Sequence, residues 1–147
     1  MDWTVKSFSE LSLEELYQLL ELRSEVFIVE QECAYQDVDG VDLECHHLFG
    51  KADGKIVSYL RILPPGLTFP EASIGRVVIQ SEYRGQKLAG PMLETAIQYL
   101  TEEMGQETIK ISAQTYLKKF YQAHGFVAVS DMYLEAGIPH MDMVYKK

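Results

Sequence analysis

The segment that most constrains the fold is a run of β-branched residues that leads directly into a glycine-bearing turn. The run is IGRVVIQ, residues 74–80, and the turn is SEYRGQKLAGPM, residues 81–92. β-Branched side chains favour a strand, whereas Pro91 is tolerated in a helix only within the first turn. The sequence therefore predicts a strand that runs into this turn and a helix that begins within a few residues before Pro91.

The turn itself combines small residues with cations. Gly85, Ala89 and Gly90 leave the main chain accessible, and Arg84 and Lys87 add positive charge. The first N–H groups of a helix lack partners and carry a partial positive charge, so a turn of this kind suits a phosphate. Any α/β protein needs a turn at such a place, but the glycines, the two cations and the proline together predict a bound diphosphate.

Hydrophobic periodicity and turn signals define the remaining elements. WTVKSF alternates as a strand does, and SLEELYQLLELRSEVF is a helix that opens with Ser12 and Glu15 spaced as a capping box. Its predicted apolar stripe consists of Leu13, Leu16, Leu20 and Phe27. HHLFGKADGKIVSYLRIL reads as two strands joined by a tight turn at residues 52–54.

The second half of the chain continues this alternation. We expect IGRVVIQ to be a central strand, followed by a helix whose apolar face carries Leu88, Met92, Leu93, Ala96, Ile97 and Leu100. TIKISAQ is a strand, YLKKFYQAH a short helix, and FVAVSDMYLEA and HMDMVYKK are strands around the turn at residues 137–139. The order β-α-β-β-β-α-β-α-β-β predicts one domain, residues 1–147, of the α/β (α+β layered) class.

The composition disfavours several classes of function. The 147 residues carry a net charge of −9, which disfavours nucleic-acid binding. No apolar run approaches the roughly 18 residues that span a bilayer, and the first residues do not resemble a signal peptide, so we expect a cytoplasmic protein without a membrane partner. Cys33 and Cys45 are expected to be free thiols, and neither they nor the stretch DVDGVD has the spacing of a metal site, so no metal is assigned.

Acidic residues are concentrated in one stretch. Between Ser24 and Gly50 there is no Lys or Arg, and the acidic residues there are Glu25, Glu30, Glu32, Asp37, Asp39, Asp42 and Glu44. Such a stretch is either a solvated loop or a surface that attracts a cationic partner such as an amine. Under the second interpretation, the acidic stretch from Glu30 to Glu44 would steer the amine and hold it, and neutralising Asp37, Asp39 and Asp42 would test this.

RVVIQSEYRGQKLAGPMLETAI resembles the acyl-CoA signature of the GNAT superfamily of N-acetyltransferases, Arg/Gln-x-x-Gly-x-Gly/Ala after a strand. Arg84 and Ala89 fit this pattern, whereas Lys87 stands where the superfamily usually has glycine. The ElaA-like branch is similar even there, with an R-G-x-K turn. The stretches LRSEVFIVEQECAYQDVDGVD, SAQTYLKKFYQAHGF and EAGIPHMDM also resemble that branch.

The resemblance implies a fold and a set of roles. The fold would be a GNAT-like mixed, mostly antiparallel sheet of six to seven strands flanked by helices. Acetyl-CoA would be the co-substrate, and Tyr121, in the motif Tyr-x-x-x-Gly-Phe, would be the general acid for the departing thiolate. The implied cofactor-binding residues are Val77, Val78, Ile79, Arg84, Gly85, Gln86, Lys87, Leu88, Ala89, Gly90 and Gln114.

The acceptor and the general base stay open. Glu30, Gln31 and His140 are expected to bind the acceptor, a small-molecule or peptide amine, and the candidate bases are Glu30, Glu32, His46, His47 and His140. A water chain could replace a side-chain base. The alternative to an enzyme is a non-catalytic acyl-CoA-binding sensor module, and a homodimer is an open alternative to a monomer.

Overall fold

The N-terminal half of the chain forms an antiparallel sheet of four strands in the order β1-β2-β3-β4. The computed structural model describes all 147 residues, and this sheet comprises β1 (Trp3–Ser7), β2 (His46–Ala52), β3 (Lys55–Leu63) and β4 (Ser73–Ile79). In the turn between β2 and β3, Asp53 and Gly54 have φ values of +52° and +77°. Two positive φ values match the twist of a two-residue hairpin, and the predicted hairpin is confirmed.

The C-terminal half forms a second sheet around its longest strand. β8 (Ile138–Lys146) pairs with β5 (Thr108–Gln114), β6 (Phe126–Ala128) and β7 (Tyr133–Glu135), each time antiparallel. The single strand predicted for residues 126–136 is wrong, because residues 129–132 leave the ladder and split it into β6 and β7. The turn falls at Ala136 and Gly137, with φ values of +50° and +77°, one residue earlier than predicted.

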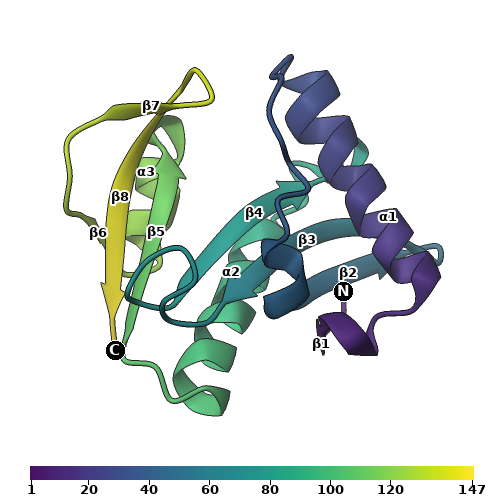
Figure 1. The fold of residues 1–147 in the computed structure, drawn as a ribbon, viewed down its shortest axis with the longest axis horizontal. Helices are drawn as coiled ribbons and strands as arrows, with labels where there is room; N and C mark the ends of the chain where they lie inside the picture. Colours follow the sequence, from purple (N-terminus) through teal and green to yellow (C-terminus); the bar gives the residue numbers. More distant parts are fainter.

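The two sheets meet at the starts of β4 and β5 and separate beyond that point. A parallel bridge joins Ala72 to Ile109, and the amide of Lys110 donates to the carbonyl of Ala72 at 2.9 Å. Figure 1 shows β4 and β5 diverging from this junction toward the top of the view. β4, predicted to be central, is therefore the last strand of its own sheet, and its outer edge has no partner strand along the divergence.

Helices cover both faces of the first sheet. α1 (Leu13–Arg23) continues as a π-helical segment, Ser24–Glu30, and lies on one face, whereas α2 (Ala89–Gln98) continues as a second π-helical segment, Tyr99–Glu103, on the other (Figure 1). α3 (Lys118–Ala123) contacts β6 of the second sheet. None of these helices has the length and the apolar character that a bilayer crossing requires.

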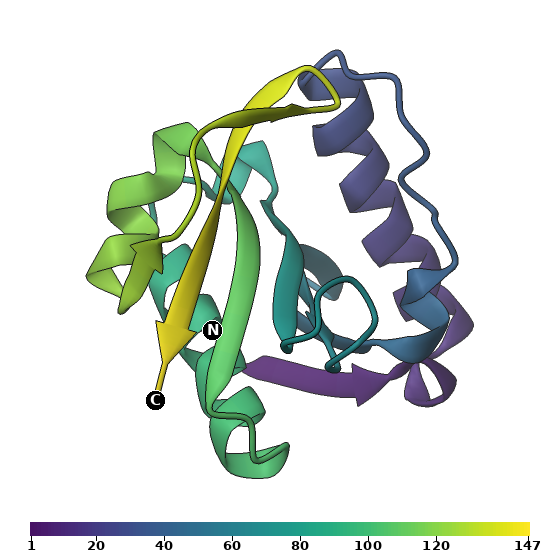
Figure 2. The ribbon, with the colours of Figure 1, turned by 60° about the vertical axis from the view of Figure 1, so that its left-hand side comes forward.

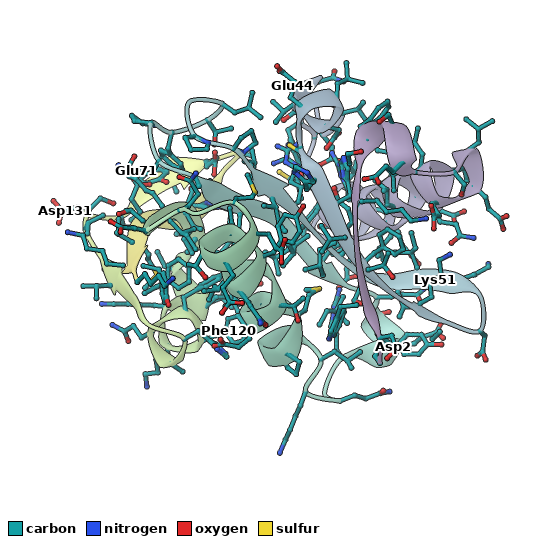
Figure 3. The ribbon with its side chains drawn as sticks, turned by 90° about the horizontal axis from the view of Figure 1, so that it is seen from below. Asp2, Glu44, Lys51, Glu71, Phe120 and Asp131 are labelled. Carbon is teal, nitrogen blue, oxygen red and sulfur yellow. The ribbon has the colours of Figure 1, made fainter.

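The core divides between these two faces because side chains alternate along the strands. The larger cluster joins α2 to both sheets and includes Leu48, Leu60 and Ile111, all buried. The smaller cluster packs α1 against the opposite face of β2, β3 and β4 through residues such as Phe49 and Tyr59. Seen from below in Figure 3, Phe120 and Glu71 lie on the side of the green and yellow elements, and Lys51 and Glu44 lie on the side of the blue and purple ones.

The start of α1 is as predicted, and its buried face is as predicted except at Leu13. The amide of Glu15 donates to Oγ of Ser12 at 3.0 Å and the Glu15 carboxylate accepts from the Ser12 amide at 2.9 Å, which completes the capping box. The predicted stripe fails at Leu13, which is 88% exposed. Leucine recurs on two sides of this helix, and the side that carries Leu19, Leu22 and Val26 packs into the core.

Candidate functional site

A cavity of about 560 Å³ opens where β4 and β5 diverge. Its walls come from the end of the π-helical segment after α1, the loop that follows, the middle of β4, the end of β5, α3, and the β7–β8 hairpin. In Figure 2, the yellow β7–β8 turn approaches the blue segment that follows α1, and Sγ of Cys33 donates to the carbonyl of Ala136 there at 3.1 Å. The cavity is therefore bounded by segments far apart in the sequence, and it could hold a ligand between the two sheets.

A β-bulge shapes the β4 wall. The β3–β4 register shifts between Tyr59 and Arg61, and Arg76, opposite this shift, has a φ of +52°. A bulge bends a strand and changes the direction in which its groups point. Val77, beyond the bulge, lines the cavity, whereas Val78 is 4% exposed and packs under α1, and Ile79 packs against the larger core cluster.

The turn after β4 has the backbone of an anion-binding loop. Gly85 and Lys87 both have positive φ values, +79° and +59°, on either side of Gln86. Such alternation directs successive N–H groups to one side of the chain and forms a concavity for an anion. The position at which the GNAT pattern has glycine therefore needs a left-handed backbone, and here a lysine adopts it.

The helix that follows begins without a side-chain cap. α2 starts at Ala89, so Pro91 lies in the first turn as predicted, and the Leu88 side chain that precedes the helix offers no hydrogen-bond acceptor to its first N–H groups. A helix end of this kind attracts an anion. The imidazole of His124 packs beside Gly90, where a Cβ atom would lie 3.5 Å from the ring.

Arg84 does not point freely from this turn. Its guanidinium forms a two-pronged ion pair with Glu30, in which Nη2 lies 3.0 Å from Oε2, and its Nε donates to the carbonyl of Ile79 at 3.0 Å. Hydrogen bonding to Arg84 lowers the pKa of Glu30. Glu30, which is predicted to bind the acceptor, thus pairs with a predicted cofactor residue and does not line the cavity.

Tyr121 lines the cavity from α3. It is 5% exposed, and it packs edge to face against Phe120 and Phe126 with ring centroids 5.2 and 5.7 Å away. Burial raises the pKa of Tyr121, and no hydrogen bond to a protein group offsets this effect. The phenol is therefore held neutral, and its hydroxyl is available to a ligand.

The remaining predicted residues lie at the other end of the cavity. Gln114 and His140 are direct partners in the β5–β8 ladder, and both line the cavity together with Gln31. Nδ1 of His140 lies 2.7 Å from the carbonyl of Ile138. Of the three residues predicted to bind the acceptor, Gln31 and His140 line the cavity and Glu30 does not.

The acidic loop is paired internally. Asp37 accepts from Arg23 at 2.9 Å and from Arg76 at 2.7 Å, and Asp42 accepts from Arg23 at 2.8 Å. Arg61 completes the network through a two-pronged pair with Asp39 and a 3.0 Å bond to Asp42.

The steering hypothesis for Asp37, Asp39 and Asp42 is therefore wrong, because three arginines neutralise the three carboxylates. The sequence alone does not indicate this pairing, because the three arginines lie outside the acidic stretch. The network instead fixes the loop over the cavity, because Arg61 and Arg76 line the cavity wall.

Several polar residues of the cavity are absent from the sequence prediction, among them Ser112, Tyr133, Glu135 and Asp142. Ser112 could have been found, because alternation in TIKISAQ places it on the same face as Gln114. The sequence did not indicate that Tyr133 and Glu135 line the cavity, because the break between β6 and β7 that positions them was not predicted.

Comparison with known proteins agrees with this geometry. The chain matches the model of the acetyltransferase (GNAT) domain over residues 8–147. It is 38% identical to the protein ElaA of Escherichia coli over 145 residues, which cover 97% of this chain and 95% of ElaA. The crystal structure of E. coli ElaA superposes with a TM-score of 0.92, at 37% identity and with 99% and 100% of the two chains covered.

Two further structures are similar. An acyl-CoA N-acyltransferase from Pseudomonas aeruginosa is 45% identical, covers 99% of both chains and superposes with a TM-score of 0.92. An aminoglycoside 6′-N-acetyltransferase complexed with coenzyme A shares the fold alone, at 14% identity and a TM-score of 0.71, with 97% and 96% of the two chains covered.

Proposed function

Because the chain belongs to the GNAT family of N-acetyltransferases, we propose that it transfers an acetyl group from acetyl-CoA directly to a primary amine bound in the cavity between β4 and β5. Acetyl-CoA supplies the activated acetyl group as a thioester. The residues of the chain have four tasks: to hold the diphosphate, to polarise the thioester carbonyl, to free the amine of its proton and to protonate the departing thiolate.

The observation that carries the proposal is the continuity of β4, the turn and α2. The turn has positive φ values at Gly85 and Lys87, and α2 begins without a side-chain cap or an acidic residue in its first turn. Main-chain N–H groups and the partial charge of the helix end fit a diphosphate in residue type and in backbone conformation. Arg84 and Lys87 would add cationic contacts, and Gln86, Leu88 and Ala89 would contribute backbone.

The outer edge of β4 fits the rest of the co-substrate. Main-chain groups of Val77 to Ile79 on that edge have no partner strand, so an extended amide-bearing arm could pair with them as an added strand does. A backbone N–H on this edge, at Val78 or Ile79, would polarise the thioester carbonyl. Gln114, across the divergence on β5, would contact the same arm.

Tyr121 would act as the general acid. A phenol with a raised pKa stays protonated at neutral pH, and it would give up its proton only as negative charge develops on the departing thiolate. Its hydroxyl has no protein partner that must first be displaced. Gln31 and His140, which also line the cavity, would contact the acceptor amine.

The test is release of free coenzyme A thiol from acetyl-CoA with a panel of amines: spermidine, glucosamine, lysine and a peptide with a free N-terminus. We expect amine-dependent thiol release, together with an acetylated product of mass 42 Da above the amine, which is about the mass of one acetyl group in place of one hydrogen. A chain that binds coenzyme A in calorimetry, yet acetylates nothing in the panel or in a metabolite extract, would be the non-catalytic sensor.

A further inference from the structure

Five polar residues form a connected group at the end of the cavity nearest the β7–β8 hairpin. Ser112 comes from β5, Tyr133 and Glu135 from β7, and His140 and Asp142 from β8. The ladders place Ser112 directly opposite Asp142, and Tyr133 directly opposite His140. All five line the cavity that also contains Tyr121.

Backbone contact fixes the tautomer of His140. Nδ1 lies 2.7 Å from the carbonyl of Ile138, and a carbonyl can only accept, so Nδ1 carries the hydrogen in the neutral ring. The lone pair is therefore on Nε2, which makes no hydrogen bond and lies 3.4 Å from Oε2 of Glu135. His140 is only 8% exposed, and it stacks on Tyr133 with ring centroids 6.3 Å apart. The ring is thus held in one orientation, with Nε2 as the nitrogen that can accept a hydrogen.

The side-chain oxygens of the other four residues lie in a chain of close contacts, and the chain has one hydrogen fewer than it has contacts. Tyr133 donates to Oδ1 of Asp142 at 2.6 Å, and Oγ of Ser112 lies 2.5 Å from the Tyr133 hydroxyl and 3.1 Å from Oε2 of Glu135. These are three contacts, but two hydroxyl groups bring only two hydrogens when both carboxylates are ionised. Burial and the hydrogen bond to Asp142 raise the pKa of Tyr133 to about 12, so Tyr133 keeps its own hydrogen.

The other candidate bases either are engaged in ion pairs or hydrogen bonds within the protein or lie outside the cavity. Glu30 is paired with Arg84. Both ring nitrogens of His47 are bonded, to the Tyr59 hydroxyl at 2.6 Å and to the Asp42 carbonyl at 2.9 Å. Glu32 and His46 do not line the cavity. His140 alone of the five combines a free ring nitrogen with a place in the cavity wall.

We propose that His140 is the general base for the acceptor amine and that Glu135 receives the proton from it. This inference rests on the proposed function. The acceptor enters as an ammonium ion; one of its N–H bonds breaks as an N–H bond forms at Nε2 of His140, and the freed lone pair attacks the thioester carbonyl. When the tetrahedral intermediate collapses, its C–S bond breaks, Tyr121 gives its hydrogen to the departing thiolate, and the second proton lost by the nitrogen restores the neutral phenol. Glu135 stabilises the imidazolium and then accepts its proton, which supplies the missing hydrogen of the oxygen chain. Glu135 passes the proton to water, because its side chain is 59% exposed.

The surroundings of His140 favour this direction of transfer. The charged and titratable groups packed around it are Glu135 and Tyr133 on β7, Asp142 on its own strand with Lys110 of β5 behind it at 3.8 Å, and Cys33 next to Ala136. The two arginines that line the cavity, Arg61 and Arg76, are already paired with aspartates. Carboxylates therefore dominate near the imidazole, and Oε2 of Glu135, 3.4 Å from Nε2, is placed to receive a proton from it.

The test compares the full-length wild type with His140→Gln, Glu135→Gln and the exposed control Glu103→Gln in acetyl-CoA-dependent acetylation of the best amine of the panel. We expect His140→Gln to lower kcat about 100-fold at neutral pH, with the KM for acetyl-CoA unchanged. The loss should shrink as the pH rises, because more of the ammonium ion then loses its proton to solvent without help from a base. Glu135→Gln should lower kcat about tenfold and move the acidic limb of the rate profile to lower pH.

The outcomes separate the two claims. A wild type that acetylates no amine overturns the proposed function, and the base with it. An active wild type and a folded His140→Gln with the same kcat and the same pH profile overturn the base alone, and so does an effect confined to the KM for the amine. If circular dichroism shows that His140→Gln does not fold, Glu135→Gln decides the matter, because its exposed side chain can change without disturbing the core.

Discussion

Glu30 and Arg84 form a two-pronged ion pair that links the end of the segment after α1 to the turn before α2. Nη2 of Arg84 lies 3.0 Å from Oε2 of Glu30, and both side chains are about 40% exposed, at 43% and 40%. The two residues are predicted from the sequence to contact different substrates. Their pairing means that the segment after α1 is connected to the turn that we propose holds the diphosphate.

Removal of the Glu30 charge should strengthen coenzyme A binding. In Glu30→Gln the guanidinium of Arg84 no longer has a competing carboxylate, so its charge is available to a diphosphate. We expect the Kd for coenzyme A to fall about threefold at low salt, a modest change because surface ion pairs contribute little. Isothermal titration calorimetry measures it, with Glu25→Gln as the control. A Kd that rises by a similar factor would show that Glu30 positions Arg84 for the ligand.

The positive φ of Lys87 predicts how the turn tolerates substitution. Lys87→Gly keeps the backbone that the turn needs, so the Kd for coenzyme A should stay within about threefold of the wild type. Lys87→Val should weaken binding about tenfold or more, because a β-branched residue resists a φ of +59°. Gln86→Val, at a neighbouring position without positive φ, is the control. If Lys87→Gly abolishes binding, the ammonium group and not the backbone conformation is what matters.

Tyr121→Phe should separate chemistry from stability. The hydroxyl has no protein partner, so its loss should change the free energy of unfolding by less than about 1 kcal/mol. The general acid is lost, and we expect kcat to fall about 30- to 100-fold with the KM for acetyl-CoA unchanged. Steady-state kinetics checks this, with Tyr116→Phe, an exposed tyrosine, as the control. Equal rates in Tyr121→Phe and the wild type would exclude Tyr121 as the acid.

The arginine–aspartate network should be a large component of stability. Asp42 is 5% exposed and accepts from Arg23 and Arg61, so Asp42→Asn leaves two buried guanidinium groups short of a charge. Breaking a buried pair costs about 3–5 kcal/mol, which lowers the Tm by roughly 10 °C for a domain of this size. Thermal unfolding measures the change, and Asp131→Asn, at an exposed position, should leave the Tm unchanged. An equally stable Asp42→Asn would mean that the network only shapes the loop.

The same network predicts acid sensitivity with a definite sign. Burial alone would raise the pKa of Asp39, but Arg61 and Arg76 lower it to about 2. A carboxyl whose pKa is depressed in the folded state adds stability above its unfolded pKa, near 3.9, and loses it as the pH falls toward the folded value. The urea midpoint should therefore decline between about pH 4 and pH 2, and less steeply in Asp39→Asn. A midpoint independent of pH in this range would contradict the assignment.

Local signals account for the elements that were predicted correctly. The capping box of Ser12, the hairpin at Asp53 and Gly54, and the first-turn position of Pro91 each depend on neighbouring residues alone. The predicted stripe on α1 is confirmed only in part. Leu16, Leu20 and Phe27 pack in or against the core, but the packing of the sheet centres on the face of Leu19 and Leu22 and leaves Leu13 exposed, and periodicity within the helix does not contain that information.

The same difference between local signals and contacts between distant segments applies to the candidate site. The turn of Gly85 to Gly90 and Tyr121 of α3 belong to contiguous motifs, so the sequence alone identifies them as candidates. Pairs such as Glu30 with Arg84, or Asp37 with Arg76, join residues 54 and 39 positions apart, and they depend on how the sheets assemble. The oxygen chain at Tyr133 depends further on the unexpected break between β6 and β7.

The most direct test of this account is a crystal structure of the chain with coenzyme A. We expect the diphosphate to accept hydrogen bonds from main-chain amides between Gly85 and Gly90 at the start of α2, and the thiol to point into the cavity near Tyr121. A molecule of coenzyme A bound away from this turn, or no binding at millimolar concentration, would contradict it.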